Sequence, residues 1–342
     1  MTYTDQAPKT ANLVFRPSGP FSLEPLRTMA CGFLRGTRQC GAGGAVRIAF
    51  PEDQTFRPIG VELREQDGEL HAQVRGAEGP QSLERVRRQL ARTLGLDGDG
   101  WPFAHLLAAD PALAPIARRR PGFRPVVAYS PYVMAGMSVL SQRLSIAQAA
   151  KIQMRIAEEQ GDVVEVGGQR LASFPRPESL LAYDEFPGVS SEKWRRLRIV
   201  ARAAQGGVLC ADALSALPYE QAKQRLLALH GIGPWTASAI LIRGCGLTDE
   251  LPIEEPRLLS AIGQVYGLGR AATVTEALCI AESWRPFRTW VSVLLVSEDF
   301  ARAQPATRNR PRARAASRNA SAIILSGSAK MTRSSGGRNS SR

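Results

Sequence analysis

The order of apolar and polar residues changes character near residue 100. Before it, AVRIAFP (45–51), PIGVELREQ (58–66) and ELHAQVRG (69–76) show the alternation or apolar bias of strands. Asp67–Gly68 separates the last two and is typical of a two-residue hairpin turn. SLERVRRQLARTLGL (82–96) instead has the period of a helix. Residues 1–100 are therefore predicted to form an α+β domain.

After Trp101, apolar residues recur at helical spacing in segments separated by Pro and Gly. Examples are FAHLLAADPALAPIARRR (103–120), YVMAGMSVLSQRLSIAQAAKIQMRIAEEQ (132–160) and SEKWRRLRIVARAAQGG (191–207). After about residue 170 we find no strand pattern except short apolar runs within helices. Residues 101–300 are therefore predicted to be all-α, with many short helices and tight connections.

The segment LLALHGIGPWTASAILIRG (226–244) places a glycine-rich turn between two helical patterns. The first predicted helix covers 219–229 and the second runs from about Trp235 to Arg243. Gly231 and Gly233 permit a left-handed or closely approached backbone, and Pro234 suits the first turn of the second helix. Unpaired N–H groups at a helix start can bind a phosphate, which would position DNA without reading its sequence. In isolation, the same pattern equally suits a helix–helix turn that binds nothing.

This segment resembles the hairpin of the helix-hairpin-helix DNA glycosylases, most closely the 3-methyladenine DNA glycosylase II (alkylation-repair) branch. Further similar segments follow in the family's order over about residues 13–295: FRPSGPFSLEPL (15–26), SPYVMAGMSVLSQRLSIAQAAKI (130–152), GVSSEKWRRLRIVARAAQGG (188–207) and AESWRPFRTW (281–290). The resemblance implies an α+β domain with an antiparallel sheet, then all-α helix-hairpin-helix domains. It also implies an active-site cleft between two helical subdomains, with the hairpin at 219–243.

The resemblance implies a catalytic carboxylate at Glu255, where family members hold Asp. Glu254 is the less favoured neighbour. Such a carboxylate can stabilise the cationic sugar and orient a water molecule. Glu is one methylene longer than Asp, and a misplacement of about 1 Å can lower a rate roughly 100-fold. Alternatively, the two glutamates simply open a helix, where its dipole favours acidic residues.

Bifunctional relatives carry a nucleophilic Lys where this chain has Trp235. Because an indole cannot attack the sugar, the resemblance implies a monofunctional enzyme that uses water. Trp235 is also a candidate wall of the pocket that receives the flipped base, although a core position is an equal alternative. The family's late aromatic, which stacks on that base, is missing around Val296 and Ser297.

The remaining candidate sites are contacts to DNA. The resemblance places Gln142 and Arg143 at the gap left by the flipped base, although a solvent-facing Arg143 is an alternative. Ser191 and Lys193 begin a helix and are candidates for a second phosphate contact, or merely part of a capped surface helix. The hairpin contacts are predicted at Gly231, Ile232, Gly233 and Thr236.

Composition adds a basic tail to this picture. The chain has 342 residues and a formal net charge of +13. Residues 301–342 hold ten Lys and Arg and no acidic residue, which leaves +3 for residues 1–300. The tail is predicted to be disordered, and its charge can add affinity for nucleic acid.

Cysteine spacing and hydropathy bear on cofactors and location. The five cysteines form no CxxC pair, so we expect no iron–sulfur cluster, no zinc site and no disulfide framework. No cofactor is predicted, although the sequence leaves open a monovalent cation at the hairpin. The chain has no secretion signal or membrane-spanning run, so we expect a protein of the cytoplasm, in a bacterial cytosol or nucleoid, with no membrane partner. We also expect it to be monomeric.

The predicted function is removal of alkylated, 3-methyladenine-type bases from damaged double-stranded DNA, the first step of base excision repair. The target base would be flipped out and its N-glycosidic bond hydrolysed. The alternative is a protein of the same fold that binds damaged DNA with impaired catalysis. The Glu at 255, the missing aromatic and the unusual tail favour this alternative.

Overall fold

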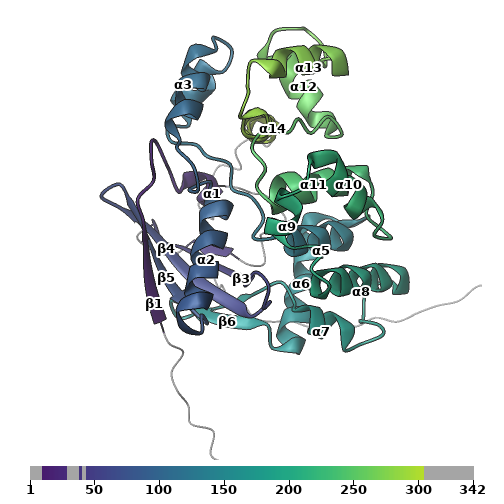
Figure 1. Ribbon diagram of the computed structural model, residues 1–342. Coiled ribbons are helices and arrows are strands. Elements are labelled where there is room, and N and C mark those ends of the chain that lie inside the picture. Colours follow the sequence, from purple (N-terminus) through teal and green to yellow (C-terminus); the bar gives the residue numbers. More distant parts are fainter. Residues whose placement is uncertain (1–9, 29–37, 41–43, 304–342) are drawn as a thin grey trace, which may run out of the picture. The chain divides into compact units, whose positions relative to one another are not determined.

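The computed structural model describes residues 10–28, 38–40 and 44–303. The tail was predicted to be disordered over residues 301–342, but residues 301–303 form the end of a helix (Arg288–Ala303). Residues 304–342 and Cys31 lie outside the described residues, so the prediction of disorder is not tested there. Figure 1 shows the described chain from an N-terminal sheet to a set of helices.

The N-terminal sheet has five strands in the order β1-β5-β4-β3-β2, and every adjacent pair is antiparallel. The strands are β1 (Thr10–Phe15), β2 (Arg38–Cys40), β3 (Val46–Pro51), β4 (Pro58–Gln66) and β5 (Glu69–Arg75). The turn between β4 and β5 has positive φ angles at Asp67 and Gly68, as the predicted hairpin turn requires. β3, β4 and β5 lie where the sequence pattern predicts strands, whereas β1 and the three-residue β2 were not predicted.

Helix α2 (Gly79–Leu94) packs against the sheet. It buries Val86, Leu90 and Leu94, which lie along one of its faces, in the core that it shares with the strands. It ends at Gly95, which has a φ of 62° in the left-handed region and forms a glycine C-cap. A short helix, α1 (Glu24–Thr28), lies between β1 and β2 in the sequence.

The first helical group shares a hydrophobic core with the sheet. It contains α5 (Pro131–Ser141), α6 (Ile146–Gln160), α7 (Pro177–Leu181), α8 (Ser191–Gln205), α9 (Ala211–Ser215), α10 (Tyr219–Leu227) and α11 (Pro234–Ala239), which continues into a π-helical turn at Ile240–Gly244. α5 contacts α8 and the π-helical turn extensively.

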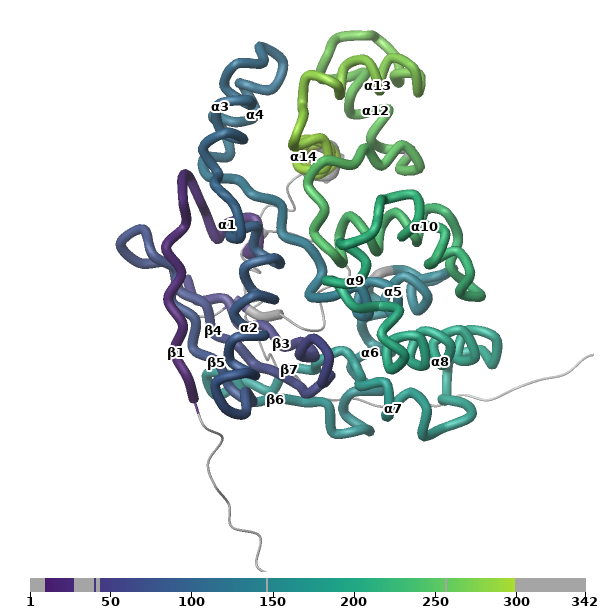
Figure 2. Tube along the Cα trace, in the orientation of Figure 1, coloured from purple at the N-terminus to yellow at the C-terminus, as the bar shows by residue number. Residues whose placement is uncertain are grey.

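The second helical group has a core of its own, in which Leu107, Leu258 and Trp284 are buried. It joins α3 (Trp101–Ala109) and α4 (Ala114–Arg119) to α12 (Pro256–Val265), α13 (Val274–Glu282) and α14 (Arg288–Ala303), which are distant from them in sequence (Figure 2). Tyr266 links the early and the late segments of this group. Its hydroxyl donates to Asp110 Oδ2 at 2.6 Å and accepts from Trp284 Nε1 at 2.9 Å.

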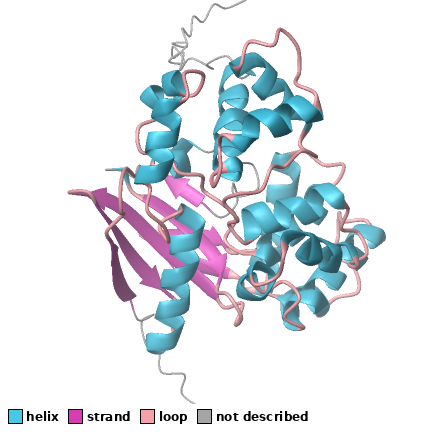
Figure 3. Cartoon of the chain, turned by 45° about the horizontal axis from the view of Figure 1, so that its top comes forward, coloured by secondary structure: helices cyan, strands magenta, loops and turns pink. Residues whose placement is uncertain are grey.

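The prediction that residues 101–300 are all-α is wrong at one place. β6 (Val163–Val166) and β7 (Gln169–Ala172) form an antiparallel hairpin between α6 and α7. Gly167 and Gly168 make its turn with positive φ angles of 55° and 74°. Val166 and Leu171 pack against Ala49 of β3, so tertiary burial stabilises a hairpin that is too short to stand alone. Figure 3 shows the strands in magenta and the helices in cyan.

Candidate active site

The two hairpin glycines have different structural roles. Gly231 has a φ of 94°, and a Cβ built there would lie 2.8 Å from Arg196 Cδ. Gly233 instead has an extended backbone, with φ −94° and ψ 176°, and an added Cβ would meet nothing within 4 Å. The left-handed conformation therefore occurs only at Gly231, while the space above Gly233 is open.

The start of α11 determines which hairpin atoms are available to a ligand. Ile232 is 5% exposed and its N–H donates to Leu229 O at 3.0 Å, so its side chain lies in the core and its N–H is already bonded. The side chain of Thr236 is also buried. In the first turn of α11, the N–H groups of Trp235 and Thr236 lack a carbonyl partner within the helix. A phosphate contact here would therefore be made by the backbone, not by the Ile232 and Thr236 side chains.

Gln142 connects the end of α5 to the hairpin. Its Nε2 donates to Gly231 O at 3.2 Å, and its Oε1 accepts from Arg196 Nη1 at 2.8 Å. Arg143 follows with an exposed side chain and a φ of 57°. A left-handed backbone is uncommon for a residue with a side chain, and here it turns the chain sharply between α5 and α6.

The ammonium of Lys193, a candidate phosphate contact, is already hydrogen-bonded within the protein. Its Nζ donates to Leu140 O at 2.9 Å and to Gln142 O at 2.7 Å, at the end of α5. Partial burial lowers the pKa of this ammonium. Ser190, not Ser191, caps α8, because its Oγ accepts the Lys193 N–H. Ser191 is the exposed first residue of the helix. The geometry therefore favours a positioning role for Lys193.

A cavity of about 130 Å³ lies between residues of the two helical groups. α11 and the turn that follows it contribute one wall, and α12 and α14 contribute another. Its lining is mostly apolar, with two acidic and two basic side chains among Phe123, Met134, Trp235, Ser238, Ala239, Ile242, Arg243, Pro252, Glu254, Glu255, Arg257, Ser292, Val293, Val296 and Ser297. The cavity therefore brings together Trp235, Glu254 and Glu255, which are up to 20 positions apart in the sequence.

Glu255 is both the N-cap of α12 and a wall of this cavity. Its Oε1 accepts from Arg257 Nε at 2.6 Å and from the Arg257 N–H at 3.3 Å. Its Oε2 accepts from Arg257 Nη2 at 3.0 Å and from Trp235 Nε1 at 3.4 Å. Partial burial acts to raise the pKa of Glu255, but these hydrogen bonds and the charge of Arg257 outweigh it and lower the pKa. Glu255 therefore begins a helix and also faces the cleft as an anion.

Glu254 belongs to a separate ion pair, because its Oε1 accepts from Lys223 Nζ at 2.6 Å. Partial burial acts to raise the pKa of Glu254, but the hydrogen bond and charge of Lys223 lower it overall. Burial acts in the opposite direction on Lys223, whose pKa is nevertheless raised by Glu254. The Lys223 amine is thus held protonated.

Val296 and Ser297, where the family's late aromatic is missing, do line the cavity. Ser297 Oγ accepts from Arg120 Nη1 at 2.9 Å, which ties α14 to the end of α4. Trp235 is 38% exposed, and Phe123 is a second aromatic in the lining. Phe123 and Arg257 line the cavity but were not among the predicted site residues. No local pattern marks Phe123, whereas a basic residue two positions after Glu255 was a visible signal.

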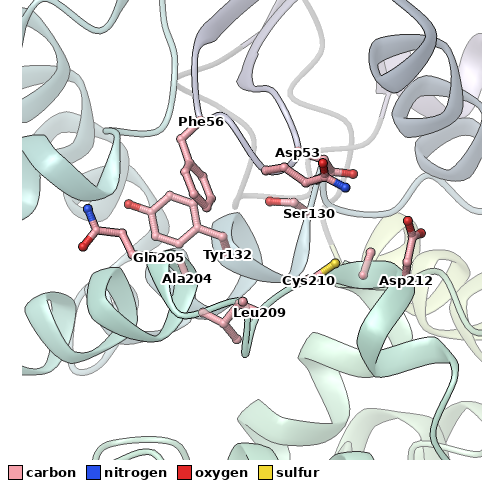
Figure 4. Close-up of a pocket in the computed structure, with 12 residues that line it drawn as sticks. Asp53, Phe56, Ser130, Tyr132, Ala204, Gln205, Leu209, Cys210 and Asp212 are labelled. Carbon is pink, nitrogen blue, oxygen red and sulfur yellow. The ribbon is translucent and has the colours of Figure 1, made fainter. Parts of the chain in front are cut away.

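A larger cavity, of about 270 Å³, lies elsewhere and contains none of the predicted site residues. It is lined by the turn after β3, the start of α5 and the connection from α8 to α9 (Figure 4). Asp53, which lines it, is ion-paired, since its Oδ2 accepts from Arg92 Nη2 at 2.6 Å. The smaller cleft is the better candidate active site because it joins an ionised carboxylate, an exposed indole and the hairpin.

Among residues 10–28, 38–40 and 44–303, no group of three or more His, Cys, Asp or Glu side chains is placed to hold a metal ion. The prediction that no cofactor is needed stays a prediction, as does the cation at the hairpin. Across the same described stretches, no helix has the length and apolar character to cross a membrane.

No protein-family model matches this chain. Several known proteins are nevertheless similar to it in sequence. A DNA-3-methyladenine glycosylase of Bacillus subtilis is 26% identical over 216 residues, which cover 62% of this chain and 71% of that protein. A probable bifunctional transcriptional activator/DNA repair enzyme of Mycobacterium tuberculosis is 31% identical over 208 residues, covering 59% of this chain and 40% of that protein. This chain therefore spans less than half the length of the second relative.

The fold is shared with a solved 3-methyladenine DNA-glycosylase from Archaeoglobus fulgidus. The TM-score is 0.69 at 22% sequence identity, and the match covers 84% of this chain and 98% of that one. The shared fold and the similar sequences together confirm the predicted resemblance to the helix-hairpin-helix DNA glycosylases and their 3-methyladenine DNA glycosylase II branch.

Proposed function

We propose, from its resemblance to the 3-methyladenine DNA glycosylases, that this protein is a monofunctional DNA glycosylase. It removes alkylated, 3-methyladenine-type bases from damaged double-stranded DNA by hydrolysing the N-glycosidic bond. The observation that carries the proposal is the cleft itself, in which Glu255 and Trp235 meet next to the hairpin. Their closest polar atoms are 3.4 Å apart.

The cleft supplies the two elements that base excision needs. A flipped purine would enter against Trp235 and Phe123, and an alkylated cationic base is attracted to the face of an aromatic ring. Glu255, kept ionised by its neighbours, would stabilise the positive charge that develops on the sugar and orient the attacking water. Excision at this site therefore requires the Glu255 carboxylate to be an anion.

The amines near the cleft support water as the nucleophile. Trp235 occupies the position after the hairpin and has no amine. Lys223 reaches Glu254, which lines the cavity, but this ion pair raises the pKa of the Lys223 amine. A protonated amine is not a nucleophile, so Lys223 does not replace the lysine of bifunctional relatives.

The hairpin and the turn after α5 would hold the DNA. Open space above Gly233 lets a phosphate approach the first-turn N–H groups of α11. The exposed Arg143, with its left-handed backbone, is suited to enter the gap left by the flipped base. These contacts position DNA and leave base selection to the cleft.

Release of free base from methylated duplex DNA tests the proposal. We expect the wild type to release 3-methyladenine and Glu255→Gln to lose at least about 100-fold in rate, because the amide carries no charge. Glu254→Gln is the matched control and should retain most activity. Release by Glu255→Gln at the wild-type rate would remove the catalytic role from Glu255.

A second candidate function is binding of damaged DNA without excision. It is favoured by the four donors that occupy the Glu255 carboxylate and by the missing aromatic at 296–297. If wild type and Glu255→Gln both bind damaged duplex and neither releases base, this function replaces the enzymatic one for these lesions.

A further inference from the structure

Every acceptor position of the Glu255 carboxylate is occupied. An ionised carboxylate accepts about four hydrogen bonds. Glu255 receives the Arg257 N–H, Arg257 Nε and Nη2, and the Trp235 indole. In this arrangement the carboxylate has no acceptor position left for water, and its charge is balanced by a guanidinium held through two hydrogen bonds.

One of these donors must leave before Glu255 can act on a sugar or a water. The Arg257 N–H belongs to the first turn of α12 and cannot move without the helix. The Trp235 indole makes the longest of the four contacts, at 3.4 Å, and its departure would leave the positive charge of Arg257 on the carboxylate. The Arg257 side chain is 45% exposed, whereas that of Glu255 is 14% exposed. An ion pair with an exposed partner is weak, and only departure of the Arg257 guanidinium frees both the charge of Glu255 and two of its acceptor positions.

The place of Arg257 also determines what can displace it. Its side chain lines the same cavity as Trp235 and Glu255. A nucleotide that enters this cavity brings the phosphates of its own strand to the mouth, because they are covalently attached to it. A phosphate accepts the same two-pronged contact from arginine that a carboxylate does. The DNA strand therefore supplies a competing anion at the right position.

We propose that Arg257 exchanges its partner when DNA binds, leaving the Glu255 carboxylate for a phosphate of the strand that carries the flipped base. In the free protein the ion pair keeps Glu255 occupied. In the complex the same guanidinium contributes to DNA affinity, and the carboxylate is released to the cleft. This inference rests on the proposed function, since it assumes that DNA enters this cleft.

A second arginine pair in the same helical group provides a matched control. Arg270 Nη1 and Nη2 donate to Glu276 at 2.8 and 2.7 Å, and Glu276 lies in the first turn of α13. Both arginines are exposed and both glutamates begin a helix, but the Arg270 pair does not line the cavity. Arg270→Gln therefore removes a similar ion pair without touching the proposed exchange.

Salt dependence of binding tests the new phosphate contact without any chemistry. The probe is a duplex containing a tetrahydrofuran abasic-site analogue, which cannot be excised. Each phosphate neutralised contributes about 0.9 to the slope of log K against log salt. We expect Arg257→Gln to reduce the slope by about one, and Arg257→Lys and Arg270→Gln to keep the wild-type slope. A wild-type slope for Arg257→Gln, in a variant that melts at the wild-type temperature, would overturn the exchange.

The pH dependence of the single-turnover excision rate tests whether Arg257 has left Glu255 in the complex. The rate is measured at saturating protein as the pH is lowered. The other charged groups that line the cavity, Glu254 and Arg243, are unchanged in Arg257→Gln. If Arg257 has already left, wild type and variant lose activity at the same pH. If the variant loses activity at a higher pH, Arg257 still lowers the pKa of Glu255 in the complex and the proposal is wrong.

The two arms separate this inference from the proposed function. If the wild type releases no base, the glycosylase function fails for these lesions, and the salt slope still decides whether Arg257 contacts phosphate. If base is released but the slope of Arg257→Gln equals that of wild type, the function stands and the exchange fails.

Discussion

The indole Nε1 of Trp235 lies 3.4 Å from Oε2 of Glu255, and this contact joins the two helical groups. Trp235 follows the hairpin in the first turn of α11, and Glu255 caps α12. The element suited to hold a phosphate is thereby linked to the carboxylate suited to act on a sugar. A shift of one group relative to the other would separate DNA positioning from chemistry.

The length of residue 255 is the first property to test. Glu255→Asp withdraws the carboxylate by about 1 Å from the Arg257 and Trp235 donors, and misplacement of this size can lower a rate by roughly 100-fold. We expect base release from methylated duplex to fall by at least tenfold, with DNA affinity within about threefold of wild type. Glu254→Asp provides the control at the neighbouring carboxylate. Faster release by Glu255→Asp would show that the wild-type site is catalytically impaired.

Trp235 contributes an aromatic face and an N–H, and two substitutions separate them. Stacking of a base on an aromatic side chain contributes about 1–3 kcal/mol, so Trp235→Ala should raise the KM for damaged duplex by roughly 5–150-fold. Trp235→Phe keeps a ring but loses the N–H that reaches Glu255, and should stay within about fivefold of wild type. If both variants raise the KM equally, the contribution of Trp235 comes from its hydrogen bond to Glu255 and not from stacking.

Much of the fold was predictable because its signals are local. Alternation marked β3, β4 and β5, and the turn at Asp67–Gly68 fixed the pairing of β4 with β5. β2 was missed because three residues are too few to show alternation. β1 is as long as β3, and its pairing with β5 is a contact between distant segments that no local pattern marks. The β6–β7 hairpin had a visible Gly167–Gly168 turn, but it lay within a region of helical patterns that dominated the interpretation.

The candidate site was predictable only in part. The hairpin and Glu255 could be located from the family's order of segments, since both depend on sequence position. Phe123 reaches the cleft through the packing of the second helical group, which no local pattern encodes. The same holds for Lys193, whose ammonium is directed to the Leu140 and Gln142 carbonyls rather than outward. Contacts between distant segments decide such roles.

The hairpin glycines should separate stability from DNA binding. Gly231→Ala forces a side chain into a left-handed backbone and towards Arg196, which should lower the free energy of unfolding by roughly 1–3 kcal/mol. Gly233→Ala meets open space on an extended backbone, so the expected loss is only that of a poorer N-cap, about 1 kcal/mol or less. Its methyl group would occupy the space in which a phosphate approaches, and DNA affinity should fall roughly tenfold. Thermal melting and duplex titration measure the two effects. Unchanged affinity in Gly233→Ala would rule out a phosphate above this glycine.

Glu192 connects α8 to the hairpin and gives the fold a pH dependence. Its carboxylate accepts from Arg195 Nε at 2.9 Å and Arg196 Nε at 2.8 Å, and lies 3.2 Å from His230 Nε2. Hydrogen bonds from Arg195, His230 and Arg196 lower the pKa of Glu192 from 4.5 to about 2. Because the pKa is lower in the folded protein, this carboxylate stabilises the fold above about pH 4.5, and the contribution disappears as pH falls towards 2.

Glu192→Gln should therefore lower the melting temperature at pH 7, and its difference from wild type should shrink steadily between pH 5 and pH 2. Glu220→Gln is the matched control, since Glu220 also lies in the first turn of its helix, α10. The measurement is melting by calorimetry over this pH range for the three proteins. A constant difference between Glu192→Gln and wild type would mean that the amide disturbs packing and that the ionised carboxylate adds no stability. Convergence near pH 2 would instead tie the stability of the hairpin to the charge on α8.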